Sequence, residues 1–392
     1  MQWIWQSSAW PEFGWPKFSW KDEPLQPLLR AVQQKSGVLQ GKASLSSPAE
    51  QSLQALLANI VASSAIEDEK LNAQSVRSSL ARHLGISEEQ PYPVSERSEG
   101  LAEMMMDALQ NHQQVLTVER LYQWHRWLFP QSETGFLNKI RVGQLRGPEP
   151  MQVVSGRLDR PTVHYEAPPR AGLEQAVQQF IDWFNRTAAN PASDPLLRAA
   201  VTHLWFVTLH PFDDGNGRLT RALTDMALAQ ADSQSVRLYA MSVAILADRK
   251  GYYAALNQTQ QLASSESAAD NREKENDTAQ TLDITPWLRW FLQTLEAAID
   301  SAIRTIDRTI EKTRFWQQHR DTPLSKEQIR VLNRLLDGGE KGFEDGISAS
   351  QYQKVAKVSK ATATRHLADL LEKGCIEKLP GGGRSTRYRI AR

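Results

Sequence analysis

The sequence has little cysteine, little net charge and no long apolar run. One cysteine, Cys375, occurs among 392 residues, which excludes an internal disulfide and suits a reducing compartment. The formal net charge of +1 predicts no particular partner. No apolar run approaches the ~18 residues that span a bilayer, and the N-terminus lacks the basic start and apolar core of a signal peptide. We therefore expect a cytoplasmic protein without membrane contact, long enough for about two or three domains.

The most informative stretch is residues 210–221, His-Pro-Phe-Asp-Asp-Gly-Asn-Gly-Arg-Leu-Thr-Arg. It lies between two apolar helical patterns. Asp194 and Pro195 cap and start the first helix, and Pro211 ends it, which places His210 at its C-terminal end. The Gly-Asn-Gly turn leads into the N-terminus of the second helix, where converging backbone N–H groups and the helix dipole favour an anion.

The charged side chains of this stretch suit the phosphates of a nucleotide. Arg218 and Arg221 lie one turn apart at a helix end where the dipole disfavours cations, and a bound anion would remove that conflict. Asp214 could hold Mg²⁺, which prefers one or two carboxylates plus phosphate oxygens. His210 is placed to take a proton from a nucleophile. A Walker A loop and a calcium loop are excluded, because their required residues are missing.

These twelve residues match, position for position, the signature of the Fic family, His-Pro-Phe-x-Asp/Glu-Gly-Asn-Gly-Arg-x-x-Arg. Members of that family mostly transfer AMP from ATP to a Ser, Thr or Tyr hydroxyl of a target protein. The resemblance implies that His210 is the general base and that Asp214 is the Mg²⁺ ligand. It implies a nucleotide-binding role for the remaining motif residues: Gly215, Asn216 and Gly217 as the α-phosphate anion hole, and Arg218 and Arg221 on the β- and γ-phosphates.

A helix that precedes the motif resembles the family's inhibitory helix. Its start at residues 47–50, Ser-Pro-Ala-Glu, reads as a capping box with proline at the first helical position. In isolation, Glu67 at its far end would be a solvated residue. The family's inhibitory motif, however, is Ser/Thr-x-x-x-Glu-Gly/Asn, and Ser63 and Glu67 fit it. The resemblance implies that Glu67 pairs with Arg221 and takes the place of the γ-phosphate. Asp68 departs from the pattern, because Gly or Asn is usual there.

Residues 143–169 change from the helical pattern to short extended segments joined by turns. Fic proteins have a β-hairpin flap before the motif, which aligns the target backbone by adding a strand. By resemblance we assign Val153 and Val154 to this target-docking flap.

A segment after the motif resembles the family's adenine-side element. Tyr253 and Leu256 could cover the base, and Gln260 could form a hydrogen bond with it. Core packing is the alternative, since paired tyrosines on a helix are often buried.

The first twenty residues are rich in tryptophan: Trp3, Trp5, Trp10, Trp15 and Trp20. Their spacing is too irregular for a helix and too aromatic for a disordered tail. They either pack onto neighbouring helices as a small subdomain or form a surface that recognises targets. The segment also resembles a small N-terminal module of unknown role on some Fic proteins, which does not decide between the two.

Residues 323–392 have a different charge, with 14 Lys and Arg against 8 Asp and Glu, a net charge of +6. Residues 348–356 and 360–373 read as two helices around a short turn, followed by a strand, a tight loop at 381–384 and a second strand. This pattern resembles a winged helix-turn-helix module. It suits DNA binding, and equally protein contact or dimerisation.

The sequence thus predicts a mainly α protein in four parts: a Trp-rich segment (1–45), a helical module with the inhibitory helix (46–100), a Fic-type helical core with a small β-hairpin flap (101–318) and a winged-helix domain (323–392). The expected function is a self-inhibited protein adenylyltransferase that uses ATP and Mg²⁺, and a homodimer is common in the family. The alternatives are a DNA-binding regulator whose core senses nucleotide, or an enzyme that removes AMP. The intact His210 favours an enzyme, because a sensor needs no base.

Overall fold

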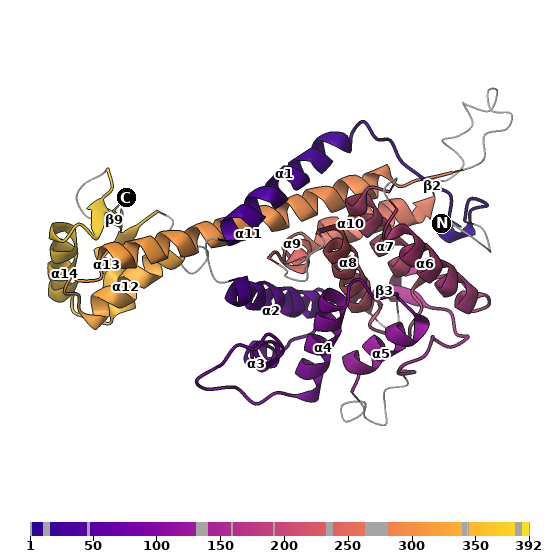
Figure 1. Cartoon of the computed structure of the whole chain (residues 1–392), viewed down its shortest axis with the longest axis horizontal. Helices are drawn as coiled ribbons and strands as arrows, with labels where there is room; N and C mark the ends of the chain where they lie inside the picture. The colour runs from indigo at the N-terminus through magenta and orange to yellow at the C-terminus, as the bar shows by residue number, and fades with distance from the viewer. Residues whose placement is uncertain are drawn as a thin grey trace. The chain divides into compact units, whose positions relative to one another are not determined.

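The computed structural model describes residues 2–10, 16–44, 48–130, 140–157, 160–190, 193–232, 238–262, 281–338, 343, 345–380 and 386–391. Within these residues the protein is mainly helical, with 14 α-helices and several small sheets (Figure 1), so the predicted fold class is confirmed at that level. No helix among them is both long and apolar enough to cross a membrane. The chain divides into two compact units, Met1–Gln40 with Ser47–Ala302 and Gly41–Ser46 with Ile303–Arg392.

The first unit is centred on two buried helices, α7 (Pro195–Leu209) and α8 (Asn216–Asp232), which pack against each other (Figure 1). Local signals set the bounds of α7. The Asp194 side chain accepts hydrogen bonds from two backbone N–H groups of the first turn, with Pro195 at the first helical position. His210 ends the helix in the left-handed conformation, with φ of 48°. The motif therefore forms the turn between the two most buried helices.

The other helices of this unit lie around that pair. Their bounds are α1 (Gln26–Ala43), α2 (Pro48–Ile66), α3 (Ala73–His83), α4 (Glu96–Gln110), α5 (Val118–Leu128), α6 (Leu173–Thr187), α9 (Met241–Ala247), α10 (Arg249–Gln260) and α11 (Thr285–Gln318), of which α1 and α11 have residues in both units. The side chain of Asn59 fixes α2 to this core: it donates to Asp225 of α8 at 2.8 Å and accepts from the backbone N–H of Ser242 of α9 at 2.9 Å. Ser47, the predicted cap of α2, lies outside the described residues.

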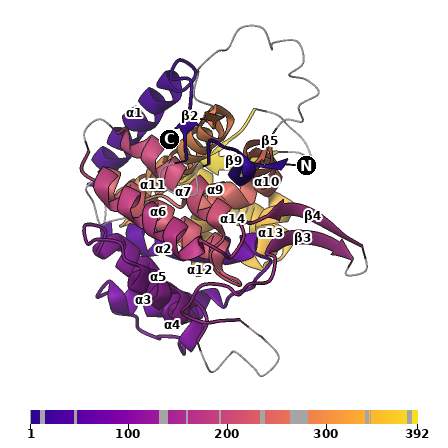
Figure 2. The same cartoon turned by 90° about the vertical axis from the view of Figure 1, so that its right-hand side faces the viewer.

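Three small sheets complete the first unit. The short strand β1 (Gln2–Trp3), which precedes the 3₁₀ helix η1 (Ile4–Gln6), pairs antiparallel with β5 (Gln261–Leu262). A parallel pair joins β2 (Phe18–Ser19) to β6 (Leu282–Asp283). The third is a hairpin of β3 (Gln152–Arg157) and β4 (Arg160–Glu166), which projects from the helices in Figure 2 and has a register shift between Val153 and Val154.

Two of the N-terminal tryptophans, Trp3 and Trp10, pack onto the first unit. This agrees with the first of the two interpretations of the segment, a small subdomain packed onto neighbouring helices. Trp3 is buried against Tyr165, and Trp10 contacts Phe18 edge to face with ring centroids 5.7 Å apart. Trp15 lies outside the described residues.

The second unit contains three helices of its own, α12 (Lys326–Asp337), α13 (Ala349–Ala356) and α14 (Lys360–Glu372). Three antiparallel strands accompany them in the order β7 (Ile347–Ser348), β9 (Arg387–Ile390), β8 (Ile376–Lys378). The hydroxyls of Ser348 and Ser359 cap α13 and α14. The predicted loop at 381–384 lies outside the described residues.

Candidate active site

His210 is held from the backbone side by a buried arginine. Nε of Arg146 donates to the carbonyl of His210 at 2.9 Å, and Nη2 donates to the carbonyl of Pro168 at 2.5 Å. Nδ1 of His210 lies 3.2 Å from the Val207 carbonyl. A carbonyl only accepts, so Nδ1 carries the proton and Nε2 keeps the lone pair that a general base needs. Burial lowers the pKa of His210 below its usual value, which keeps this lone pair free at neutral pH.

The Gly-Asn-Gly turn is stabilised by the side chain of Asn216. Its Oδ1 accepts from the Phe212 N–H at 2.9 Å, and its Nδ2 donates to the Phe212 carbonyl at 2.8 Å. Gly215 has a φ of 80°, and a Cβ there would lie 2.6 Å from a methyl group of Leu128. A Cβ on Gly217 would lie 2.1 Å from Oε1 of Glu67. The positive φ and the Leu128 contact thus require glycine at Gly215, whereas a Cβ on Gly217 would displace the end of the Glu67 side chain. The Asn216 side chain holds the loop.

Arg221 contacts both predicted inhibitory residues. Its Nη2 donates to Oε1 of Glu67 and to the Ser63 carbonyl, each at 2.8 Å, and its Nε donates to the Ser63 hydroxyl at 2.8 Å. Arg221 is only 3% exposed. Burial alone would raise the pKa of Glu67, but the charge and hydrogen bond of Arg221 outweigh it and hold that pKa below its usual value. Glu67 is therefore a bound carboxylate in this structure.

A second carboxylate, which the sequence reading missed, contacts the other motif arginine. Oε2 of Glu69 accepts from Nη1 of Arg218 at 2.5 Å, and Glu69 also forms an ion pair with Arg97 of α4. Arg218 is 4% exposed, its guanidinium lies 5.1 Å from the Phe129 ring, and no acceptor among the described residues reaches its Nε. The acidic run Glu67-Asp68-Glu69 in the sequence indicates that cationic partners are present, but it does not show which arginine Glu69 contacts.

The residue between them, Asp68, has its own partner. Its carboxylate accepts two hydrogen bonds of 2.7 Å from Arg249 at the start of α10. Asp68 has a φ of 59°, a left-handed conformation that Gly and Asn adopt most easily and Asp tolerates. This explains both the family preference at this position and the departure from it.

The predicted adenine-side residues lie on α10, mostly in the core. Gln260 is 3% exposed and its Nε2 donates to Oγ1 of Thr208 at 3.0 Å, and Leu256 is buried. Tyr253 is partly exposed, with the Arg249 guanidinium 5.7 Å from its ring. Leu256 and Gln260 are thus buried, as core packing would have them, and their contact with a base stays a prediction.

The predicted flap residues are on the β3–β4 hairpin. Val154 is 50% exposed, and Val153 packs at the base of the hairpin against the cluster of Trp3 and Tyr165. Among the described residues β3 pairs with β4 alone, and a strand edge that has no neighbour can accept an added strand.

His125 supports the motif by contacts with Phe212 and Asp214. Its ring stacks on Phe212 with centroids 4.4 Å apart. Nδ1 accepts from the Gly143 N–H at 2.9 Å, so the proton is on Nε2, 3.2 Å from the Asp214 carbonyl. Burial lowers the pKa of His125 to about 4, so it stays neutral.

Asp214 is the motif residue best suited to a cation. Its side chain is 56% exposed, Oδ1 accepts from the Gly215 N–H at 2.6 Å, and Nη2 of Arg218 is 3.7 Å away. One accessible carboxylate beside an anion-binding turn fits Mg²⁺, which takes its other ligands from phosphate oxygens and water.

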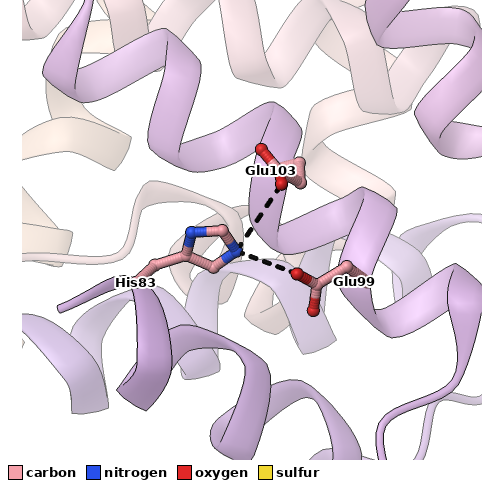
Figure 3. A group of neighbouring side chains, drawn as sticks. All are labelled: His83, Glu99 and Glu103. Atoms are coloured by element: carbon pink, nitrogen blue, oxygen red, sulfur yellow. Dashed lines mark ion pairs between the residues drawn. The ribbon is translucent and has the colours of Figure 1, made fainter. Parts of the chain in front are cut away.

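A separate group of possible ligands lies on α3 and α4 (Figure 3). Nε2 of His83 is 3.2 Å from Glu99 and 4.0 Å from Glu103. Arg82 already donates to the Glu99 carboxylate at 2.6 Å. Arg82 thus already balances the charge of Glu99, and none of the three residues belongs to the motif.

Comparison with known proteins agrees with this geometry. Residues 115–228 match the model of the Fic/DOC family, and residues 3–86 match a domain of unknown function, DUF4172. Protein adenylyltransferase fic-1 of Caenorhabditis briggsae is 28% identical over 142 residues, 36% of this chain and 24% of that protein. Protein adenylyltransferase Fic of Nematostella vectensis is 29% identical over 171 residues, 43% of this chain and 30% of that protein. The chain thus matches about a quarter of the length of these relatives.

Two solved structures are also similar to this chain, each with a TM-score below 0.5. A Fic family protein from Desulfovibrio desulfuricans has a TM-score of 0.47 at 20% identity, covering 93% of this chain and 96% of that one. A Fic domain containing signaling protein from Bacteroides thetaiotaomicron has a TM-score of 0.49 at 18% identity, covering 71% and 97%. The complete motif on the α7–α8 turn and the match over residues 115–228 show that this part of the chain is a domain of the Fic/DOC family.

Proposed function

We propose that the protein is an adenylyltransferase that moves AMP from ATP onto a hydroxyl side chain of a protein. The observation that carries this proposal is the free Nε2 of His210 at the end of α7, directly beside an anion-binding turn and two buried arginines. The curated relatives are named protein adenylyltransferases, and the segments matched in them are consistent with this activity.

In this mechanism the target oxygen attacks the α-phosphorus and passes its proton to Nε2 of His210. The bond between the α-phosphorus and the bridging oxygen breaks, and pyrophosphate leaves. The backbone N–H groups of Asn216 and Gly217, the first two residues of α8, would stabilise charge on the α-phosphate, and Arg218 and Arg221 would hold the leaving group. Mg²⁺, held by Asp214, would neutralise phosphate oxygens when bound.

We infer that the end of α2 inhibits this reaction. Glu67 occupies Arg221 and Glu69 occupies Arg218, so both cations that would hold the β- and γ-phosphates already carry a carboxylate. The Asp68–Arg249 pair adds a third contact, to α10. Since Asn59 fixes the middle of α2 to α8 and α9, we expect ATP to displace these side chains locally and not the whole helix.

The Asp214→Asn variant tests the metal role. In a Glu67→Gly background, ATP affinity should rise with Mg²⁺ concentration, and Asp214→Asn should remove most of this dependence and weaken binding about tenfold at saturating Mg²⁺, ~1.4 kcal/mol. Isothermal titration with ATP at several Mg²⁺ concentrations measures it. Asp182→Asn on α6 is the control. An unchanged magnesium dependence would remove Asp214 as the ligand.

For the second unit we propose a winged-helix fold that binds DNA. The support is the capped helix pair α13 and α14, the sheet order β7-β9-β8 and the net charge of +6 over residues 323–392. Lys360, Thr364 and Arg365 are exposed on α14. A DNA-binding regulator that uses the core as a nucleotide sensor is the alternative function of the whole chain.

Double replacement of Lys360 and Arg365 by alanine tests this interface. If both contact phosphates, the plot of log affinity against log salt concentration should become shallower by about two. Fluorescence anisotropy with a mixed-sequence DNA duplex gives this slope for the full chain. Lys326→Ala, an exposed lysine on α12, is the control. Absence of binding by wild type at low salt would favour a protein-contact role.

A further inference from the structure

The N-terminal residues 2–6 contact both sides of the candidate active site. The strand β1 pairs with β5, with Gln2 opposite Leu262 and Trp3 opposite Gln261. β5 directly follows α10, the helix on the predicted adenine side, and Figure 2 shows the N-terminus beside β5. The 3₁₀ helix η1 contacts α10 itself, and Trp3 and Trp5 contact the base of the β3–β4 hairpin.

Trp3 packs into a small apolar cluster at that base. Its ring meets the Tyr165 ring edge to face, with centroids 5.2 Å apart and an interplanar angle of 77°. Trp3, Tyr165 and Ala167 are the buried members of the cluster, and Trp5, Met151 and Val153 pack against them. The cluster therefore joins residues from both strands of the hairpin to the N-terminal segment.

Trp5 adds a hydrogen bond from its side chain to the backbone of the hairpin. Its indole Nε1 donates to the carbonyl of Glu166, the last residue of β4, at 2.7 Å. Glu166 is paired with Gln152, the first residue of β3, so this bond acts where the hairpin leaves the helices. The indole N–H is the one polar group of the ring, so Trp5→Phe would keep most of the packing and lose this bond.

The strand β4 is also joined to Thr208, two residues before His210. The Tyr165 hydroxyl donates to the Thr208 carbonyl at 2.6 Å, and its ring centroid is 6.4 Å from that of His210. Oγ1 of Thr208 accepts from Gln260 of α10. Thr208 thus connects the hairpin to α10, and residues 2–6 connect the same hairpin to α10 and to β5, which follows it.

We propose that Trp3 and Trp5 are positioning residues for the target protein: they fix the base of the β3–β4 hairpin relative to His210. A target strand added to this hairpin would then present its hydroxyl at a set distance from Nε2. The proposal rests on the proposed function and extends it, since it gives residues within the DUF4172 match a role in target positioning and none in ATP binding.

Hydrogen exchange in the full chain tests the structural step without any activity. Trp5→Phe should speed amide exchange in β3 and β4 about tenfold, ~1.4 kcal/mol, and leave α8 unchanged. Trp3→Leu should do the same by removing the contact with Tyr165. Trp10→Phe is the matched control, because Trp10 contacts Phe18. Unchanged exchange in the hairpin of both variants would overturn the proposal.

Self-labelling from α-³²P-ATP tests the functional step in the Glu67→Gly background. Trp5→Phe should lower the labelling rate at saturating ATP about tenfold and leave the KM for ATP unchanged, whereas Trp10→Phe should change neither. A raised KM for ATP, or an unchanged rate despite faster hairpin exchange, would overturn the role in target positioning. If Glu67→Gly itself gives no labelling, the proposed function fails and this role fails with it, while hydrogen exchange still decides whether Trp3 and Trp5 fix the base of the hairpin.

Discussion

Replacing His210 by alanine should lower AMP transfer by about 10²- to 10⁴-fold and leave ATP affinity nearly unchanged. The imidazole has a free lone pair beside the predicted phosphate-binding turn, and it contacts the Val207 carbonyl and the Tyr165 ring, neither of which is a predicted phosphate ligand. Arg218, Arg221 and the Gly-Asn-Gly turn do not depend on it. The loss should therefore be in the rate of transfer, because the variant keeps the nucleotide site and lacks the proton acceptor.

The measurement is incorporation of label from α-³²P-ATP in the Glu67→Gly background, with ATP affinity by isothermal titration. His83→Ala, a substitution on α3, is the control. Retained transfer would remove the general-base role, and a matching loss of ATP binding would show that His210 supports the fold of the turn. If neither the Glu67→Gly protein nor the same protein with His210→Ala transfers AMP, the result would favour the nucleotide-sensor alternative.

The pH dependence provides a second readout of the same residue. A general base acts when neutral, and burial lowers the pKa of His210 below 6.5. Transfer should therefore be independent of pH near neutrality and fall only as the pH drops through that lowered pKa. An acid limb centred above pH 6.5 would contradict this.

The parts of the site that could be predicted from the sequence are those set by local chemistry. Asp194 and Pro195 start α7 as expected, and Pro211 follows its end, because caps and proline act within one turn. Similarly, Ser359 caps α14, which begins at Lys360, the predicted residue.

The unpredicted parts depend on contacts between distant residues. Glu69 and Arg218 are 149 residues apart in the chain, and Asp68 and Arg249 are 181 apart. No periodicity or spacing encodes which of several arginines a carboxylate will meet. For Leu256 and Gln260, the helical spacing suits a pocket wall and a core equally, so only tertiary packing distinguishes the two.

Glu67→Gly and Glu69→Gln should each raise ATP affinity, and together they should raise it more than either alone. A polyphosphate needs both arginines, and each is buried and paired with a carboxylate. Removing one carboxylate leaves a buried cation that ATP can satisfy. We expect about tenfold from each change, ~1.4 kcal/mol, measured by isothermal titration, and strong self-labelling once Glu67 is removed.

The two carboxylates also stabilise the protein when ATP is absent. Their removal should therefore lower stability without ATP and raise ATP affinity, a combination that a merely misfolded variant would not show. Without ATP, Glu67→Gly and Glu69→Gln should unfold at lower temperature, because Arg221 or Arg218 then lacks its partner. With ATP they should gain more stability than wild type does, since tighter binding stabilises more at one ligand concentration. Glu50→Gln, at the other end of α2, should change neither quantity. If Glu69→Gln leaves ATP affinity unaltered in the Glu67→Gly background, Glu69 serves only to anchor Arg218, and inhibition depends on Glu67 alone.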